Sequence, residues 1–522
     1  MSGEPLSASN LGAWRCAAMA LCAAVLAANV WHLLVQTAPP AWDDAWYLEV
    51  SFRLYQALKA GLMNFLQSYA HAFRIKAPLI AVLPLPLYAV FGTGERIALW
   101  VNMLALPLTW LFAFRIGRLF YGERAGLAAA MACALLPLSY GLSRFFYVEC
   151  VLTAFVTWSV WEILRVRADD RWAGARLGAL LGLGLLAKSS FLLYVIGPIW
   201  LRREALRPHA KTALVCGGLL ASTWYAWNLP FVAGFGLSAG FGSISHSYGS
   251  HALSYAALRG FAVQVVFQAL SWPYALVAVV LLAAAWQSRP RPWNWGDREW
   301  FLLFWLGLPF LCVALAVNKQ VRYLAPILPA LAVAVGAAAA AVASGTLRTA
   351  MAALLTLAPA AVFCGQTFGI PESRPMFFNG PPSRDPGWDR RAVVETLVAK
   401  APEGAVVAIG FEHALFNANN LASLSFALGH RYEFVNLVQG NNTVEDALIR
   451  LKDKSAAYLI MVQGELPAEV GTPHDFLNRA NAGIQARLGD GRLKATRLDA
   501  IPVSHKVSAV LYKLGVGRGD EE

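Results

Sequence analysis

The chain has 522 residues, of which 58% are hydrophobic and only 14% are charged, and its formal net charge is +12. Soluble domains carry roughly 25% charged residues, whereas apolar runs of about 17–25 residues, the length that crosses a bilayer, recur here through the first two thirds. The composition therefore excludes a soluble globular protein and predicts a polytopic α-helical membrane protein. The Arg and Lys residues gather in short loops between the apolar runs, where they set membrane orientation, so they do not indicate nucleic-acid binding.

The first apolar run, 14–36, has no obvious small-residue cleavage site, so we expect a retained span rather than a removed signal peptide. If each later basic cluster faces the cytoplasm, the spans between clusters must occur in pairs. This condition places the N-terminus inside and the C-terminus outside. It is met by about eleven spans, at 14–36, 96–114, 124–142, 149–165, 174–187, 189–201, 212–232, 262–286, 299–317, 322–343 and 347–366.

The stretch 77–92 is apolar, but it is short and contains Pro78, Pro84 and Pro86. Counting it as a full span would invert every later loop and break the distribution of basic residues. We therefore expect an interfacial or re-entrant helix on the outer face.

With this orientation, polar residues collect at the outer ends of the spans. Charge at membrane depth is costly, so such groups indicate a functional site in which they are one another's partners. The set comprises Asp43, Asp44, Arg74, Lys76, Arg144, Glu149, Lys188, Lys319, Arg322 and Tyr323.

Beyond residue 366 the composition changes. Residues 367–389 are rich in Pro, Gly and charge, which is typical of a linker, and 390–522 alternates strand and helix patterns, which predicts a small extracytoplasmic α/β domain. The domain contains no glycine-rich nucleotide-binding motif. We expect strands at 405–411, 432–438, 456–463, 494–502 and 506–513, and helices at 414–428, 443–452 and 475–488.

Several short motifs follow one another over about 40–330. They are an acidic pair before a tyrosine, a Lys-Pro-Pro-Leu-like element, an arginine after a Phe-Gly turn, a Ser-Arg pair before an acidic residue, a Leu-x-x-Lys turn and a Lys-x-x-Arg-Tyr-x-x-Pro-x-x-Pro element. In this chain they are Asp43-Asp44-Ala45-Trp46-Tyr47, Lys76-Ala77-Pro78-Leu79, Phe91-Gly92 with Arg96, Ser143-Arg144 with Glu149, Leu185-Leu186-Ala187-Lys188, and Lys319 through Pro329.

In this order the motifs resemble the membrane glycosyltransferases with the C-type fold. The resemblance is to the bacterial, family 39-like branch related to protein O-mannosyltransferases and lipid A aminoarabinose transferases. That family usually has Asp-Glu in place of Asp43-Asp44, two prolines after the lysine at Lys76, and more often Asp in place of Glu149. These departures leave the functional groups in place, but they do not allow the sugar to be inferred.

The resemblance implies transfer of a sugar from a polyprenyl-phosphate carrier to an acceptor protein, lipid or glycan outside the cytoplasmic membrane. The helical domain would be 1–366, with an outer catalytic loop at 37–95. Asp43 would be the general base, with Asp44 orienting it or holding a divalent metal if one is used, and Glu149 would position the sugar or a cation. The carrier phosphate would be bound by Lys76, Lys188, Arg322 and Tyr323.

Other interpretations remain open. Asp43 or Asp44 could cap the helix that follows, Lys188 could be a snorkelling lysine, and Arg322 with Tyr323 could be an interfacial anchor. The whole chain could instead be a transporter, or a ligase or polymerase of envelope glycans. The sequence leaves the sugar, the acceptor, the metal requirement, the oligomeric state and the role of the outer domain undetermined.

Overall fold

The computed structural model describes residues 8–242, 253–287, 296–341, 345–372, 374, 376–384, 387–438, 443–466, 478 and 480–515. The chain divides into two compact units, each described by itself. The helical unit comprises Met1–Val35, Leu66–Leu83 and Leu99–Pro382. The α/β unit comprises Gln36–Phe65, Pro84–Ala98 and Ser383–Glu522.

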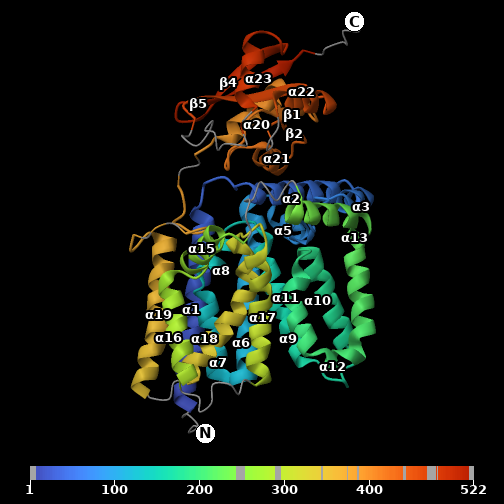
Figure 1. Ribbon diagram of the computed structural model, residues 1–522. Coiled ribbons are helices and arrows are strands. Elements are labelled where there is room, and N and C mark those ends of the chain that lie inside the picture. The colour runs from blue at the N-terminus through green and yellow to red at the C-terminus, as the bar shows by residue number, and fades with distance from the viewer. Residues whose placement is uncertain are drawn as a thin grey trace. The chain divides into compact units, whose positions relative to one another are not determined.

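The helical unit is built from long apolar helices, and α1, α16, α18 and α19 run alongside one another (Figure 1). A 3₁₀ segment, η3, precedes α18, and a π-helical segment, η2, follows α15. The bounds are α1 Ala8–Val35, α6 Glu95–Tyr121, α7 Glu123–Ala134, α8 Pro137–Leu142, α9 Val148–Arg165, α10 Ala173–Ala187, α11 Phe191–Leu201, α12 Arg203–Leu206, η1 Arg207–His209, α13 Ala210–Phe241, α15 Tyr255–Gln264, η2 Val265–Ala269, α16 Trp272–Gln287, α17 Asp297–Leu315, η3 Val321–Ile327, α18 Leu328–Ala341 and α19 Gly345–Phe368.

The predicted polytopic helical fold is confirmed, although about eleven spans is only an approximate count. Among the described residues, four helices are long and apolar enough to cross a membrane by themselves: Leu11–Val35, Glu95–Tyr121, Asp297–Leu315 and Val321–Ala341. The other predicted spans correspond to helices that are shorter, broken or less apolar.

The span predicted at 262–286 is broken into two helical segments. Tyr255–Ala269 and Trp272–Ala285 meet at an angle of 95°. Ser271, at the break, has a φ of 65°, and Pro273 follows in the first turn of α16, where a missing N–H does no harm. Proline also divides the predicted span 124–142, because α7 ends before Pro137 begins α8.

The apolar stretch 77–92 forms two short helices, α4 (Leu79–Val82) and α5 (Leu85–Phe91), in place of one long helix. Pro84 lies between them and is the N-cap of α5. In the helical unit α4 packs against α10, and in the α/β unit α5 packs against α2 (Asp43–Lys59). Helix α3 (Leu62–Ala70) precedes them in the chain.

Glycines bring two pairs of helices into close contact and so fix the helices that carry polar residues. A Cβ on Gly178 of α10 would lie 2.6 Å from Ala213 O of α13, and one on Gly336 of α18 would lie 2.6 Å from Ala125 O of α7. Small residues allow this approach of helix backbones in membranes. The contacts hold α10, whose C-cap residue is Lys188, and α18, which follows the segment containing Arg322.

The α/β unit contains a five-stranded sheet in the order β2-β1-β3-β5-β4. Strands β2, β1 and β3 are parallel, whereas β5 pairs antiparallel with both β3 and β4. The small C-terminal sheet domain expected from the sequence is thereby confirmed. The strands are β1 Val406–Ile409, β2 Glu433–Asn436, β3 Tyr458–Gly464, β4 Ala495–Ser504 and β5 Val507–Leu514.

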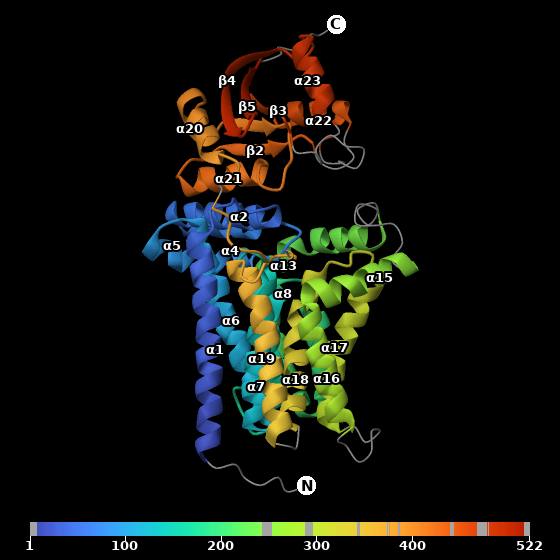
Figure 2. The same ribbon diagram turned by 90° about the vertical axis from the view of Figure 1, so that its left-hand side faces the viewer.

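Helices cover both faces of this sheet (Figure 2). Val394 of α20 (Arg390–Lys400) and Leu421 of α21 (Ala418–Ala427) join the core on one face. Ala447 of α22 (Val444–Asp453) and Ile484 of α23 (Asn481–Gly489) join the core on the other. Part of the predicted helix 475–488, residues 475–477 and 479, lies outside the described residues. Helix α20 was not predicted from the sequence.

Candidate active site

Three residues singled out in the sequence converge in the helical unit. Glu149, in the first turn of α9, is 1% exposed. Its Oε1 lies 2.8 Å from Nζ of Lys188, the residue that ends α10, and 3.7 Å from Nε of Arg322 in η3. One buried carboxylate therefore binds two cations from elements far apart in the sequence.

Aromatic rings hold the two cations in place. Nζ of Lys188 lies 4.5 Å from the ring centre of Tyr323, and Cζ of Arg322 lies 5.1 Å from that of Tyr147 and 5.6 Å from that of Tyr323. Asn318 Nδ2 donates a hydrogen bond of 3.3 Å to the Tyr323 hydroxyl, and Tyr194 donates one of 2.9 Å to the Tyr323 carbonyl. A cation over a ring face is attracted by the ring quadrupole, so the rings help to fix where the positive charges lie.

Sequence reasoning missed Tyr147. It is the N-cap residue of α9, two positions before Glu149. An aromatic residue so close to a buried carboxylate at a helix start was the only signal available.

The cluster carries a surplus of positive charge. Glu149 supplies one negative charge, while Lys188 and Arg322 supply two positive ones. Glu149 Oε2 is buried, and in the described part of the chain it has no hydrogen-bond partner. An anion that bound here could form charge-assisted hydrogen bonds with both Lys188 and Arg322.

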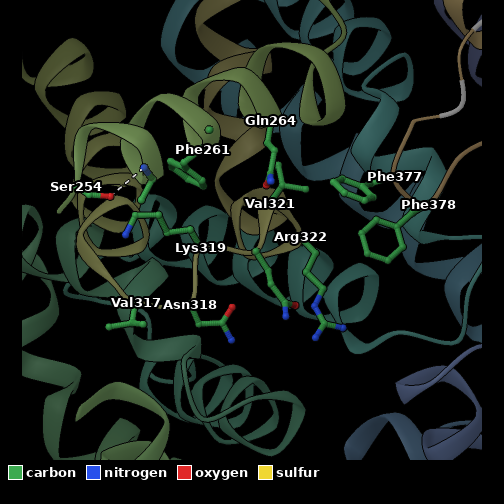
Figure 3. Close-up of a pocket in the computed structure, with 13 residues that line it drawn as sticks. Ser254, Phe261, Gln264, Val317, Asn318, Lys319, Val321, Arg322, Phe377 and Phe378 are labelled. Atoms are coloured by element: carbon green, nitrogen blue, oxygen red, sulfur yellow. Dashed lines mark hydrogen bonds between the residues drawn. The ribbon is translucent and has the colours of Figure 1, made fainter. Parts of the chain in front are cut away.

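A cavity of about 600 Å³ opens at Arg322 (Figure 3). Lys319 also lines it, and desolvation lowers the pKa of this lysine. The volume lies within the range of small-molecule binding sites, about 300–1,000 Å³. The lining residues are Ser254, Ala257, Gly260, Phe261, Gln264, Val317, Asn318, Lys319, Gln320, Val321, Arg322, Phe377 and Phe378.

Two cavity residues come from the stretch predicted as a linker. The ring of Phe378 lies 5.5 Å from that of Tyr147, which in turn faces Arg322. The Phe377 N–H donates a hydrogen bond of 2.6 Å to Gln268 Oε1. Residues 376–380 thus pack into the helical unit, and their composition gave no sign of it.

Arg144 has a different environment from the cluster. It is 6% exposed and donates hydrogen bonds to Asn29 Oδ1 (2.9 Å), the Gln366 carbonyl (3.1 Å) and Thr367 Oγ1 (2.5 Å). These contacts join the turn before α9 to α1 and α19. Arg144 therefore stabilises the packing of helices around the site.

Lys76 lies in the irregular segment between α3 and α4. Helix α4, which begins three residues later in the chain, packs against α10, the helix that ends at Lys188. The assignment of Lys76 to a phosphate site stays a prediction.

The acidic pair lies in the α/β unit, where α2 begins at Asp43. Trp42 is the N-cap residue, and its side chain makes no capping hydrogen bond. Asp43 and Asp44 both lie inside the first turn, where the helix dipole favours negative charge. Asp44 is 5% exposed, and Asp43 is partly exposed.

The backbone before the pair has an unusual conformation. Trp42 has a φ of 47° and a ψ of −116°, a combination that L-residues rarely adopt and that costs on the order of 1–3 kcal/mol. Its N–H donates a hydrogen bond of 3.2 Å to the Ala414 carbonyl, and Asn420 Nδ2 donates one to the Pro40 carbonyl. We refer to residues 40–44 as the acidic turn.

Among the described residues, no three His, Cys, Asp or Glu side chains come together as a metal site. The suggestion that Asp44 binds a divalent metal stays a prediction.

The comparisons with known proteins agree with this architecture. A family model described as dolichyl-phosphate-mannose-protein mannosyltransferase matches residues 75–227, a range that includes Lys76, Glu149 and Lys188. Among solved structures, ArnT from Cupriavidus metallidurans in the apo state aligns over 97% of this chain and 98% of its own, at 12% identity and a TM-score of 0.60. The chain has the ArnT fold.

Other solved structures show the same fold. ArnT bound to undecaprenyl phosphate aligns over 96% of this chain and 98% of its own, at 13% identity and a TM-score of 0.59. The archaeal oligosaccharyltransferase AglB from Archaeoglobus fulgidus, in complex with an inhibitory peptide and a dolichol-phosphate, covers 85% of this chain and 69% of its own. Its identity is 13% and its TM-score is 0.51. The resemblance to membrane glycosyltransferases is thereby confirmed, whereas no curated protein sequence matches the chain.

Proposed function

We propose that this chain is a glycosyltransferase that moves a sugar from a polyprenyl-phosphate carrier to an acceptor outside the cytoplasmic membrane. The observation that carries the proposal is the arrangement of Lys188 and Arg322 around the single buried carboxylate of Glu149. Its surplus positive charge, next to a cavity, suits a lipid phosphate. Known proteins with this fold support that ligand, because ArnT has been solved with undecaprenyl phosphate and AglB with a dolichol-phosphate.

The reaction requires that negative charge develop on the leaving phosphate. The bond between the sugar C1 and the phosphate oxygen breaks, and its electron pair stays on that oxygen. Lys188 and Arg322 stabilise this charge, since cations fixed before the reaction need no reorganisation. Glu149 holds both cations, Tyr323 supports Lys188, and Lys76 is proposed as a third cation.

The acceptor must lose a proton as its oxygen attacks C1. Asp43 is proposed as the general base that takes this proton, and Asp44 as the residue that orients it. The partly exposed carboxylate of Asp43 and the buried one of Asp44 suit these two roles. The acceptor is a protein, a lipid or a glycan, and the α/β unit is proposed to lie on the outer side, as the distribution of basic residues predicts.

The test is release of free carrier phosphate from a panel of polyprenyl-phosphate sugars by the purified full chain. We expect one donor to be cleaved, and we expect Arg322→Ala and Lys188→Met to lower the rate about 100-fold or more. Lys211→Met is the control, because Lys211 is an exposed lysine at the start of α13.

Release by wild type that is unchanged in both cluster variants would show that the cations do not contact the carrier phosphate. Analysis of the product in the presence of acceptors would separate transfer of one sugar from ligation of a whole glycan. Transport of an intact donor into vesicles, without any cleavage, would favour the transporter instead.

A further inference from the structure

The contacts of the acidic turn within the α/β unit suggest a role for the C-terminal domain. Asn420 is 0% exposed, and its Nδ2 donates a hydrogen bond to the carbonyl of Pro40, three residues before Asp43. The Trp42 N–H, one residue before Asp43, donates to the carbonyl of Ala414. Both partners belong to the segment that links β1 to the first turn of α21.

Trp42, which directly precedes the acidic pair, has a φ of 47°. A non-glycine residue keeps such a conformation only when its surroundings impose it. The direction in which α2 begins, and with it the placement of Asp43 and Asp44, therefore depends on the hydrogen bonds from the C-terminal domain.

Asn420 is itself held rigidly. Its N–H donates a hydrogen bond of 3.0 Å to Oδ1 of Asn417, the N-cap residue of α21. Its carbonyl accepts one of 3.4 Å from Arg390, whose guanidinium also lies 3.0 Å from Glu95 Oε1. Because the Asn420 backbone is held in this way, its side chain loses little conformational freedom when it binds and positions the Pro40 carbonyl.

Further contacts hold the rest of the N-terminal part of this unit. The Ser383 N–H donates a hydrogen bond of 2.6 Å to Gln36 Oε1, and the Thr37 N–H donates one of 2.9 Å to the Ser383 carbonyl. In the last turn of α2, Gln56 Nε2 donates a hydrogen bond of 2.9 Å to the Phe426 carbonyl. The domain thus contacts the segment before, at and after the acidic turn.

We propose that the C-terminal α/β domain positions the acidic pair for catalysis, with Asn420 as the positioning residue. The proposal rests on the proposed function for the meaning of the pair. It assigns to the domain a part in the chemical step, whereas binding of the donor phosphate belongs to the helical unit.

The experiment compares Asn420→Ala with Asn481→Ala in the purified full chain. Asn481 is a matched control, because it is also buried in the α/β unit and its Nδ2 also donates a hydrogen bond to a main-chain carbonyl, that of Gly410 at 2.6 Å. Asn420→Asp, which keeps the shape and removes the donor, serves as a second variant if alanine prevents folding. The measurements are hydrogen exchange of the Trp42 amide and the steady-state constants for the cleaved donor.

We expect exchange at Trp42 to become at least about tenfold faster in Asn420→Ala and to stay unchanged in Asn481→Ala. We expect kcat to fall about 10- to 100-fold in Asn420→Ala with little change in the donor KM. Equal losses in both variants would reduce Asn420 to a residue of domain stability and would overturn the proposal. So would an unchanged Trp42 exchange rate and kcat in Asn420→Ala. The exchange measurement needs no substrate, so a wild type that cleaves no donor would count against the proposed function alone.

Discussion

Nζ of Lys188 and Oε1 of Glu149 lie 2.8 Å apart, although 39 positions separate the two residues in the sequence. The pair joins the end of α10 to the start of α9, and Arg322 approaches the same oxygen from η3. Because Glu149 is almost fully buried, its charge depends on these partners. Removing one member of the cluster should therefore affect both stability and activity.

Glu149→Gln tests this dependence. Glutamine removes the negative charge that Lys188 and Arg322 share, and we expect the free energy of unfolding to fall by about 3–5 kcal/mol. The double variant Glu149→Gln with Lys188→Met should recover part of the stability and none of the activity. Thermal unfolding in detergent, combined in a double-mutant cycle, measures the coupling. Purely additive effects would show that the pair is not coupled in solution.

Tyr147 provides a second test, because its ring faces Arg322 at 5.1 Å. Tyr147→Leu removes the ring and should raise the donor KM about 2- to 30-fold, as expected for a cation–π interaction of about 0.5–2 kcal/mol. Tyr147→Phe keeps the ring and is the matched control, so its KM should stay near that of wild type. If Tyr147→Phe raises the donor KM as much as Tyr147→Leu does, the hydroxyl of Tyr147 contributes to donor binding and the ring face does not.

A pH effect is expected from Glu412, which lies just after β1 in the α/β unit and is 8% exposed. Burial raises the pKa of Glu412 to about 8, while hydrogen bonds from the Asn436 side chain and the Ala418 N–H lower it less. A glutamate in the unfolded chain titrates near about 4.3. The folded state therefore binds the proton more tightly, and this contribution to stability is full below about pH 4.3 and is lost as the pH rises through about 8.

We expect the α/β unit to lose stability between about pH 5 and 8, by at most about 1.4 kcal/mol per pH unit. Hydrogen exchange of β1 amides across this range measures it. Glu412→Gln should flatten the profile, because the amide does not titrate. A slope that persists in the variant would assign the effect to another group.

Much of this architecture could be predicted from residue types alone. The apolar runs predicted the helices, and the alternation of strand and helix patterns predicted all five strands, because both signals are local. Breaks such as the 95° bend before Trp272 were missed, since an apolar composition does not distinguish a straight helix from two that meet at a proline.

The ordered motifs indicated Glu149, Lys188, Arg322 and Tyr323, whose convergence the structure shows. They did not indicate Tyr147, Phe378 or Asn420. An aromatic ring or a buried amide has no fixed spacing from the charge or the carbonyl that it contacts, so only the folded chain brings these partners together. For the same reason the sequence did not predict that the turn before Asp43 would share a compact unit with residues 383–522.

The close contact of α7 with α18 offers a test of how the helical unit supports the site. A methyl group on Gly336 would lie 2.6 Å from both Ala125 O and Ala129 N, which are main-chain atoms that cannot rotate away. Gly336→Ala should therefore lower the free energy of unfolding by about 1–3 kcal/mol. Because it would shift α18 and displace Arg322, which precedes that helix, it should also lower the rate of donor cleavage. Gly218→Ala on α13 is the control, because nothing lies within 4 Å of the added carbon, and alanine favours the helix by up to about 1 kcal/mol. Thermal unfolding and donor cleavage of the two variants should diverge. If Gly336→Ala is as stable and as active as Gly218→Ala, the α7–α18 contact is looser than the structure shows, and the position of Arg322 must be set by η3 and its aromatic neighbours alone.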